Sequence, residues 1–138
     1  MILADTGPLV ALIHQDDNEH SICKETFLTF SEPLGTVWPV LTEAMYLLSF
    51  SWVAQNALWE MTQAGAVEIL SLGTDDVARM RELMRKYRDL PMDLADACVV
   101  RMTELYDRCK VWTVDRADYT AYRRYGRQTV PCEFPPLK

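Results

Sequence analysis

Short apolar segments alternate with longer helical segments along the whole chain, and this alternation is what most constrains the fold. Strands are expected at 1–4, 35–38, 66–70 and 110–114, with a further edge strand at 127–130. Helices are expected from residue 8 onward and at 18–30, 39–50, 52–64, 74–87, 92–106 and 119–125, with a tail at 131–136. Strands that alternate with helices predict a parallel sheet covered on both faces. We therefore expect an α/β chain, folded as a three-layer α/β/α sandwich with a mostly parallel sheet, in a single domain over 1–138.

The composition is that of an ordinary globular protein. Hydrophobic residues make up 49% of the 138 positions and charged residues 25%, which excludes a disordered chain, a collagen-like repeat and a disulfide scaffold. The four cysteines form no CxxC pair, and two histidines do not supply a zinc-binding pattern. The first residues lack the basic segment of a signal peptide, and no apolar run reaches membrane length. These features predict a cytoplasmic protein with reduced cysteines and no membrane association.

Charge is distributed unevenly along the chain. Residues 1–78 hold one basic residue against eleven acidic ones, a net −10, whereas residues 79–138 hold thirteen against nine, a net +4. The total of −6 is not the usual footprint of a nucleic-acid-binding protein. Composition alone therefore favours ordinary surface charge over a polyanion-binding face.

Acidic residues recur where the expected strands end and where the expected helices begin. Asp5 and Asp115 follow apolar strand segments, while Glu43, Asp93 and Asp96 lie near the starts of helices that open after prolines. Sites in open parallel sheets form beyond the carboxyl ends of the strands. If these acids meet there, they cannot all stay ionised without a cation. An oxygen-only cluster suits Mg²⁺ or Mn²⁺, which supports phosphoryl chemistry.

Each acid also has a purely structural interpretation. Asp5 and Asp93 could cap helices, Asp115 could begin a turn, and Glu43 lies among apolar neighbours. Asp96 is the hardest to explain in this way, because it lies within LADACVV, where an unpaired charge is costly. Convergence of several acids at one edge is what favours a functional site.

The ordered set of motifs resembles the PIN domain family, many of whose bacterial members are VapC-type toxins. The matching segments are ILADTGPLVAL, VLTEAMYLL, PMDLADACVV and TVDRADY, which together span almost the whole chain. The resemblance implies a metal-dependent ribonuclease in which Mg²⁺ or Mn²⁺ is held by Asp5, Glu43, Asp96 and Asp115. It implies secondary roles for Asp93, Asp118, Thr6 and Thr113. Asp118 lies three residues after Asp115 and competes with it as the fourth acid; we prefer Asp115 because it directly follows the expected strand.

The resemblance also gives the uneven charge a use. Arg116, Arg123 and Arg124 follow the last acid and are candidate RNA contacts, and the basic helix at 79–88 is either a further contact or a solvated face. An antitoxin protein and a homodimer are expected partners, because residues 39–64 hold many apolar side chains that one small domain would leave exposed. Two alternatives remain open: a catalytically silent PIN-like module that binds RNA or protein, and a stand-alone RNA-processing nuclease.

Overall fold

The computed structural model describes residues 1–136, in which short strands and helices alternate as expected. The strands are β1 (Ile2–Ala4), β2 (Leu34–Val37), β3 (Val67–Leu70), β4 (Lys110–Trp112), β5 (Arg123–Arg124), β6 (Gln128–Thr129) and β7 (Cys132–Glu133). The α-helices are α1 (Thr6–Ile13), α2 (His20–Thr29), α3 (Trp38–Leu47), α4 (Trp52–Gln63), α5 (Val77–Lys86), α6 (Leu94–Leu105) and α7 (Arg116–Ala121). A 3-10 turn, η1 (Thr74–Asp76), precedes α5. Within residues 1–136, no helix is long and apolar enough to cross a membrane.

The main sheet has five parallel strands in the order β3-β2-β1-β4-β7. The first strand lies at its centre, where Leu3 pairs with Gly35 on one side and with Val111 on the other. β1 and β2 are buried along their whole length, as expected of strands covered on both faces. Because every strand runs the same way, their carboxyl ends meet at one edge of the sheet.

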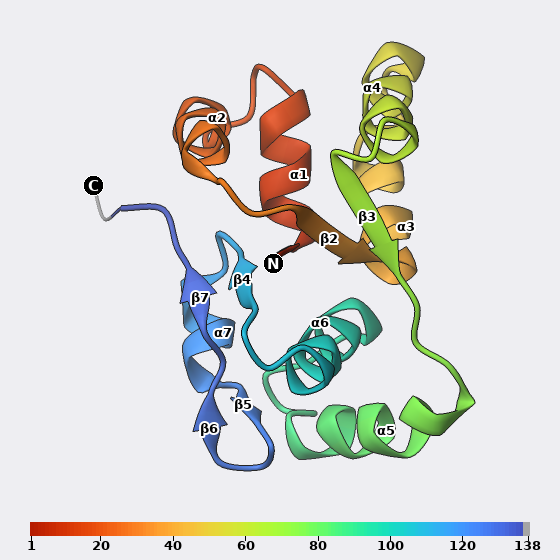
Figure 1. Ribbon diagram of the computed structural model, residues 1–138, viewed down its shortest axis with the longest axis vertical. Coiled ribbons are helices and arrows are strands. Elements are labelled where there is room, and N and C mark those ends of the chain that lie inside the picture. Colours follow the sequence, from red (N-terminus) through yellow and green to blue (C-terminus); the bar gives the residue numbers. More distant parts are fainter. Residues whose placement is uncertain (137–138) are drawn as a thin grey trace.

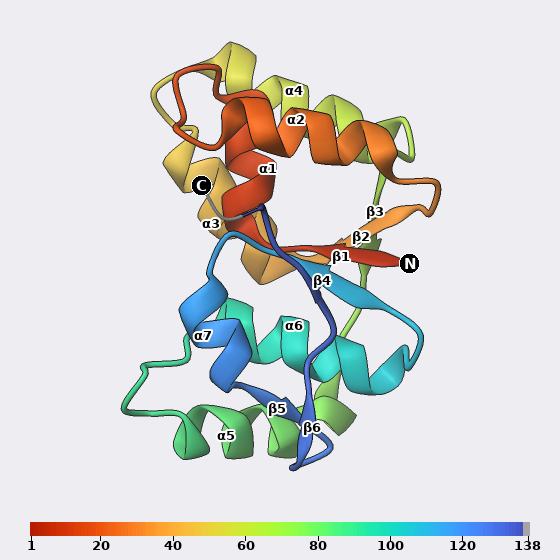
Figure 2. The same cartoon turned by 90° about the vertical axis from the view of Figure 1, so that its left-hand side faces the viewer.

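Helices cover both faces of the sheet, which confirms the expected three-layer α/β arrangement (Figure 1). α1, α2 and α4 lie on one side and α5, α6 and α7 on the other (Figure 2). α6 packs against β2 and β4, and α5 packs on the outer side of α6. α1, α6 and α7 all begin on the side of the molecule that lies opposite the N-terminus in Figure 2. Because the strands are parallel, three helices begin at the edge where the strands end.

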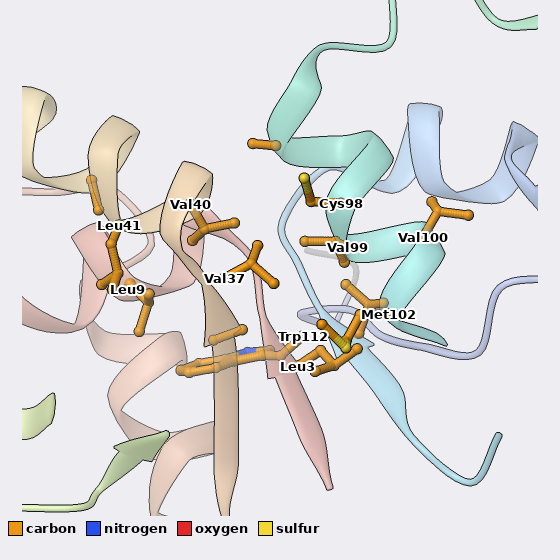
Figure 3. Close-up of a cluster of buried hydrophobic side chains, with 14 of the residues drawn as sticks. Leu3, Leu9, Val37, Val40, Leu41, Cys98, Val99, Val100, Met102 and Trp112 are labelled. Atoms are coloured by element: carbon orange, nitrogen blue, oxygen red, sulfur yellow. The ribbon is translucent and has the colours of Figure 1, made fainter. Parts of the chain in front are cut away.

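The core joins the two helical layers through the sheet (Figure 3). Leu3 and Trp112 come from the two central strands, and each is only 1% exposed. Val99 and Met102 of α6 pack on one side, and Leu9 of α1 lies on the other side of the cluster. Burying an aliphatic side chain of this size contributes about 1.5–3 kcal/mol. The core thus fixes α1 and α6 relative to β1 and β4, the elements that surround the acidic residues.

The helix expected at 119–125 lies earlier in the chain, so that boundary was wrong. α7 begins at Arg116 because the Asp115 carboxylate caps it, accepting a hydrogen bond from the Asp118 amide at 3.0 Å. The chain then enters a tight hairpin, where Tyr125 and Gly126 have φ angles of 53° and 79°. A helix cannot continue through two left-handed residues.

The edge of the main sheet also differs from the expectation. The segment expected as a strand at 127–130 contributes only β6, which pairs with β5 in a separate antiparallel ribbon. The edge strand is β7, within the expected tail, and the Val111 amide donates to the Pro131 carbonyl at 2.8 Å beside it. A two-residue strand carries too little periodicity to be recognised in a sequence. The second strand begins one residue earlier than expected, and Trp38 starts α3 instead of ending β2.

Candidate functional site: a carboxylate cluster at the sheet edge

Asp5 ends the central strand and lies almost entirely inside the protein. Its side chain is 8% exposed, and its Oδ2 accepts a hydrogen bond of 2.8 Å from the Thr113 hydroxyl. Burial raises the pKa of Asp5 to about 6, although hydrogen bonds from Thr113 and the Thr6 amide oppose the shift. Nearby negative charge from Glu43 and Asp93 raises the pKa further. The first acid is therefore desolvated and faces other carboxylates.

Asp96 lies in the first turn of α6, on the opposite side of the same edge. Tyr122 donates a hydrogen bond of 2.8 Å to its Oδ2, and Tyr119 approaches its Oδ1 at 3.5 Å. Burial raises the pKa of Asp96 to about 7, and repulsion from Asp5 is the next largest cause. Asp96 and Asp5 thus share one electrostatic environment, as two like charges near one another must.

Asp115 is tied to Asp5 through a threonine. The buried Thr113 hydroxyl donates to Asp5 and accepts the Asp115 amide at 3.0 Å. The charge of Asp115 is also among those that raise the pKa of Asp96. Asp118 lies one turn into α7, and burial together with a hydrogen bond to Asp115 raises its pKa. Both acids thus lie at this edge, and the choice of Asp115 over Asp118 as the fourth acid stays a prediction.

Asp93 and Glu43 lie at the open side of the cluster. The Asp93 carboxylate caps α6 by accepting the Asp96 amide at 2.8 Å, so the structural interpretation of this residue holds alongside any functional one. Glu43 projects from the second turn of α3 and is exposed. Partial burial and repulsion from Asp93 raise its pKa. All six predicted acids are therefore brought to the same edge, four of them at least partly buried.

In the described part of the chain, this cluster has no basic side chain as an ion-pair partner. Within residues 1–136, the ion pairs of lysine and arginine involve none of the six acids. The Thr6 hydroxyl, next to Asp5, is buried and lacks a hydrogen-bond partner in the described part of the chain. Buried carboxylates without a cationic partner are costly.

The donor set fits a hard divalent cation. Every candidate ligand is a carboxylate or hydroxyl oxygen, the chemistry that Mg²⁺ and Mn²⁺ prefer. Among residues 1–136, no three histidine, cysteine, aspartate or glutamate side chains are already gathered as a ready-made metal site. The fit therefore rests on the chemistry and burial of the donors, with Asp5, Asp96 and Asp115 as the ligands best supported and Glu43 at the rim.

Comparison with known proteins gives this edge a family context. The model of the PIN domain matches residues 2–127, a span that includes all six acids. This chain belongs to the PIN domain family. Among curated proteins it is similar to Ribonuclease VapC26 of Mycobacterium tuberculosis, with 24% identity over 91% of this chain and 94% of the relative.

Two solved structures share the PIN fold with this chain. Mycobacterium tuberculosis VapC20, described as a Sarcin-Ricin loop cleaving toxin, superposes with a TM-score of 0.79 at 19% identity, over 88% of this chain and 95% of that one. VapBC2 from Rickettsia felis, bound to a DNA fragment from its promoter, gives a TM-score of 0.70 at 15% identity, over 99% of this chain and 100% of that one. At these identities the likeness concerns the fold.

The glycine of the first PIN-like motif has a steric role. A Cβ on Gly7 would lie 2.5 Å from Cγ2 of Val114, the residue immediately before Asp115. The absence of a side chain lets the start of α1 approach the β4–α7 loop. This close approach brings the segments of Asp5 and Asp115 together.

The three arginines predicted to contact RNA have different environments. Arg124 is 8% exposed, and its Nη1 donates to the carbonyls of Thr103 and Asp107 at 3.0 Å each. This burial contradicts the prediction of an RNA contact by Arg124, which instead holds the β5 ribbon to the end of α6. Arg123 donates to carbonyls at the end of α7, including that of Thr120 at 2.7 Å. Arg116 is exposed beside Asp115 and stays a candidate contact, although its Nη2 also donates to the Pro135 carbonyl.

The two tyrosines that contact Asp96 were not among the predicted site residues. Tyr119 and Tyr122 are three residues apart at the end of α7, a spacing that places them on one helix face. That spacing was the available signal, but it does not show which partner the hydroxyl groups would meet. Their target lies in another helix, 23 and 26 residues away along the chain.

Proposed function

We propose that this protein is a divalent-metal-dependent endoribonuclease and the toxin of a type II toxin–antitoxin pair, acting in the cytoplasm. The observation that carries the proposal is the group of carboxylates of Asp5, which is buried, and of Asp96 and Asp115, which are partly buried; none of them forms an ion pair with a basic side chain within residues 1–136. The similar curated protein is named a ribonuclease, and VapC20 is described as a toxin that cleaves the Sarcin-Ricin loop. The activities named for these two proteins agree with a site that cleaves RNA.

The site residues would divide the work between binding and orientation. A bound Mg²⁺ or Mn²⁺ would offset the carboxylate charge, polarise a phosphate oxygen and favour attack by water. Asp5, Asp96 and Asp115 would hold the cation, with Glu43 closing the site from α3. Thr113 fixes the orientation of Asp5 through its 2.8 Å hydrogen bond, and Arg116 offers a positive charge to RNA next to the site.

Cleavage of RNA by the purified protein tests this proposal. Wild-type protein is expected to cut end-labelled RNA with Mg²⁺ or Mn²⁺ and to lose activity in EDTA. Asp96→Asn should lose at least about a hundredfold in rate, because it removes a ligand charge. Asp16→Asn is the matched control, since Asp16 is an exposed acid on the loop after α1. Equal cleavage in EDTA, or by Asp96→Asn, would contradict the proposal.

The same assay addresses the catalytically silent alternative. Metal-independent RNA binding by wild-type protein, with no cleavage under any cation, would favour a binding module. The toxin role has its own test in cells. Induced expression of wild-type protein should arrest growth and that of Asp96→Asn should not; growth unaffected by an active nuclease would favour a stand-alone RNA-processing role.

An apolar surface supports the proposal of an antitoxin and a homodimer as partners. On α3, α4 and the turn between them, Tyr46, Phe50, Trp52 and Val53 are 77%, 62%, 66% and 78% exposed. Apolar groups of this size on neighbouring helices are typical of protein interfaces. Among the apolar residues of 39–64, Leu58 is fully buried in the core, so core packing explains that residue but not the four exposed ones. Light scattering that shows a strict monomer at high concentration would contradict the dimer.

A further inference from the structure

Tyr119 in α7 and Tyr122 directly after its end supply the only side-chain hydroxyl contacts to Asp96 among the residues that the structure describes. Tyr122 lies 2.8 Å from Oδ2 and Tyr119 lies 3.5 Å from Oδ1, so one hydroxyl faces each carboxylate oxygen. A phenol is a neutral donor near pH 7. The two contacts therefore restrain the rotation of the carboxylate without neutralising it, and each oxygen keeps a lone pair for a further ligand.

Packing fixes the stronger of these donors in place. Tyr122 is fully buried, and its ring meets those of Tyr87 and Tyr119 edge-on, with centroids 5.1 Å apart in both pairs. Tyr87 contributes its ring to this packing, whereas its hydroxyl accepts the Arg123 amide at 2.8 Å and does not reach Asp96. The hydroxyl of Tyr122 cannot move away from Asp96 without disturbing this three-ring cluster.

The same short helix also connects two of the acids. Asp115 caps the start of α7, and Tyr122 ends it by donating its amide to the Asp118 carbonyl at 3.0 Å. One end of α7 thus carries a proposed ligand, and the other end holds the orientation of a second one on α6. A shift of α7 would alter both acids together.

We propose that Tyr122, assisted more weakly by Tyr119, is a positioning residue that holds the Asp96 carboxylate in the orientation needed to bind the divalent cation. The proposal rests on the proposed function, which makes Asp96 a cation ligand. It predicts an order of effects that follows the geometry. The loss should be larger for the 2.8 Å donor than for the 3.5 Å one, because hydrogen bonds weaken steeply with distance.

A set of matched variants tests the proposal without RNA. Tyr122→Phe and Tyr119→Phe each remove one hydroxyl, and Tyr87→Phe is the control from the same cluster because its hydroxyl does not contact Asp96. Affinity for Mn²⁺ is measured by calorimetry. Tyr122→Phe should weaken binding about tenfold or more, within the range for groups that orient metal ligands. Tyr119→Phe should weaken it less, and Tyr87→Phe should leave it unchanged. Equal affinity for Tyr122→Phe and wild type, or an equal loss in Tyr87→Phe, overturns the proposal.

A double-mutant cycle in EDTA separates this contact from the proposed function. Tyr122→Phe and Asp96→Ala, which each remove one partner of the hydrogen bond, are compared singly and together by urea denaturation. A direct hydrogen bond to a charged acceptor predicts coupling of about tenfold or more in the unfolding constant. Additive effects overturn the positioning role. If the cycle shows strong coupling but the wild-type protein binds no Mn²⁺ in calorimetry, the proposed metal site is refuted and the Tyr122–Asp96 hydrogen bond is still supported.

Discussion

Replacement of Asp5 by asparagine should stabilise the metal-free protein, even though it removes a proposed catalytic group. Folding places the Asp5 carboxylate at 8% exposure, where burial raises its pKa from 3.8 to about 6. At about 1.4 kcal/mol for each pH unit, ionised Asp5 costs the folded state about 3 kcal/mol. Asparagine carries no charge and keeps an oxygen that can accept the hydrogen bond from Thr113.

The stabilisation should depend on pH in a defined direction. Below a pH of about 4 the carboxyl is neutral in both folded and unfolded chains, so the variant gains nothing. As the pH rises from 3.8 through about 6, the unfolded chain ionises first and wild-type stability falls relative to the variant. Above pH 7 the variant should hold its full advantage of about 3 kcal/mol.

Urea denaturation in EDTA, followed by tryptophan fluorescence at about pH 4.5 and about pH 8, measures this difference. Asp16→Asn should show almost none of this stabilisation, because Asp16 is exposed to solvent. Saturating Mg²⁺ at the higher pH should reduce the advantage, because the cation stabilises the wild-type site. An Asp5→Asn protein that is no more stable than wild type at about pH 8, or that gains equally at both pH values, would refute the reasoning.

Three further predictions concern packing, charge and RNA. Glu104→Gln should lose about 3 kcal/mol, because its 2% exposed carboxylate accepts hydrogen bonds from Arg79 at 2.7–3.1 Å. Burial raises the pKa of Glu104, but those hydrogen bonds lower it more. The stabilisation is therefore present at neutral pH and is lost as the pH falls below 4.5. Urea denaturation of the wild type and the variant over a series of acidic pH values checks the size of the loss and its pH dependence. Gly7→Ala should cost about 1–3 kcal/mol in thermal denaturation through its clash with Val114, and Val114→Ala should restore part of it. Arg116→Glu should weaken RNA binding and lower the salt dependence of log affinity by about one, measured by fluorescence anisotropy in EDTA; an unchanged slope would remove Arg116 from the interface.

The sheet and its acidic edge were predictable from the sequence because both arise from local patterns. A short apolar run followed by Asp5-Thr6-Gly7-Pro8 indicates a buried strand, a turn and a helix start within eight residues. Parallel strands then bring their carboxyl ends to one edge, whatever the details of packing. Asp5 and Asp115 were placed correctly at this edge for that reason.

The environment of Arg124 was not predictable in the same way. The run of arginines after α7 reads as a basic surface, but the ribbon of β5 and β6 turns Arg124 inward to the carbonyls at the end of α6. Arg79 behaves alike, since it pairs with the buried Glu104 instead of facing solvent. Both arginines bind partners more than twenty residues away in the sequence. The identity of the residue alone therefore does not show whether its guanidinium contacts carbonyls, a carboxylate or water.

The orientation of Asp96 depends on contacts of the same long range. The LADA segment marks a helix start with an unusually placed acid, and it predicts a charge that requires a partner. The partners proved to be phenol hydroxyls of Tyr119 and Tyr122, from a helix whose position was wrong by three residues at its start. The spacing of the two tyrosines does not depend on where that helix starts, but their partner lies 23 and 26 residues away, a contact that a local pattern does not encode.

A crystal of the wild-type protein soaked in Mn²⁺ at about pH 8, where the carboxylates ionise, would test the central claim most directly through anomalous scattering. The account predicts an anomalous peak at the sheet edge, with oxygen ligands drawn from Asp5, Asp96 and Asp115, and its loss in crystals of Asp96→Asn. A fully soaked wild-type crystal without a peak at these carboxylates, or a peak that persists unchanged in Asp96→Asn, would contradict it.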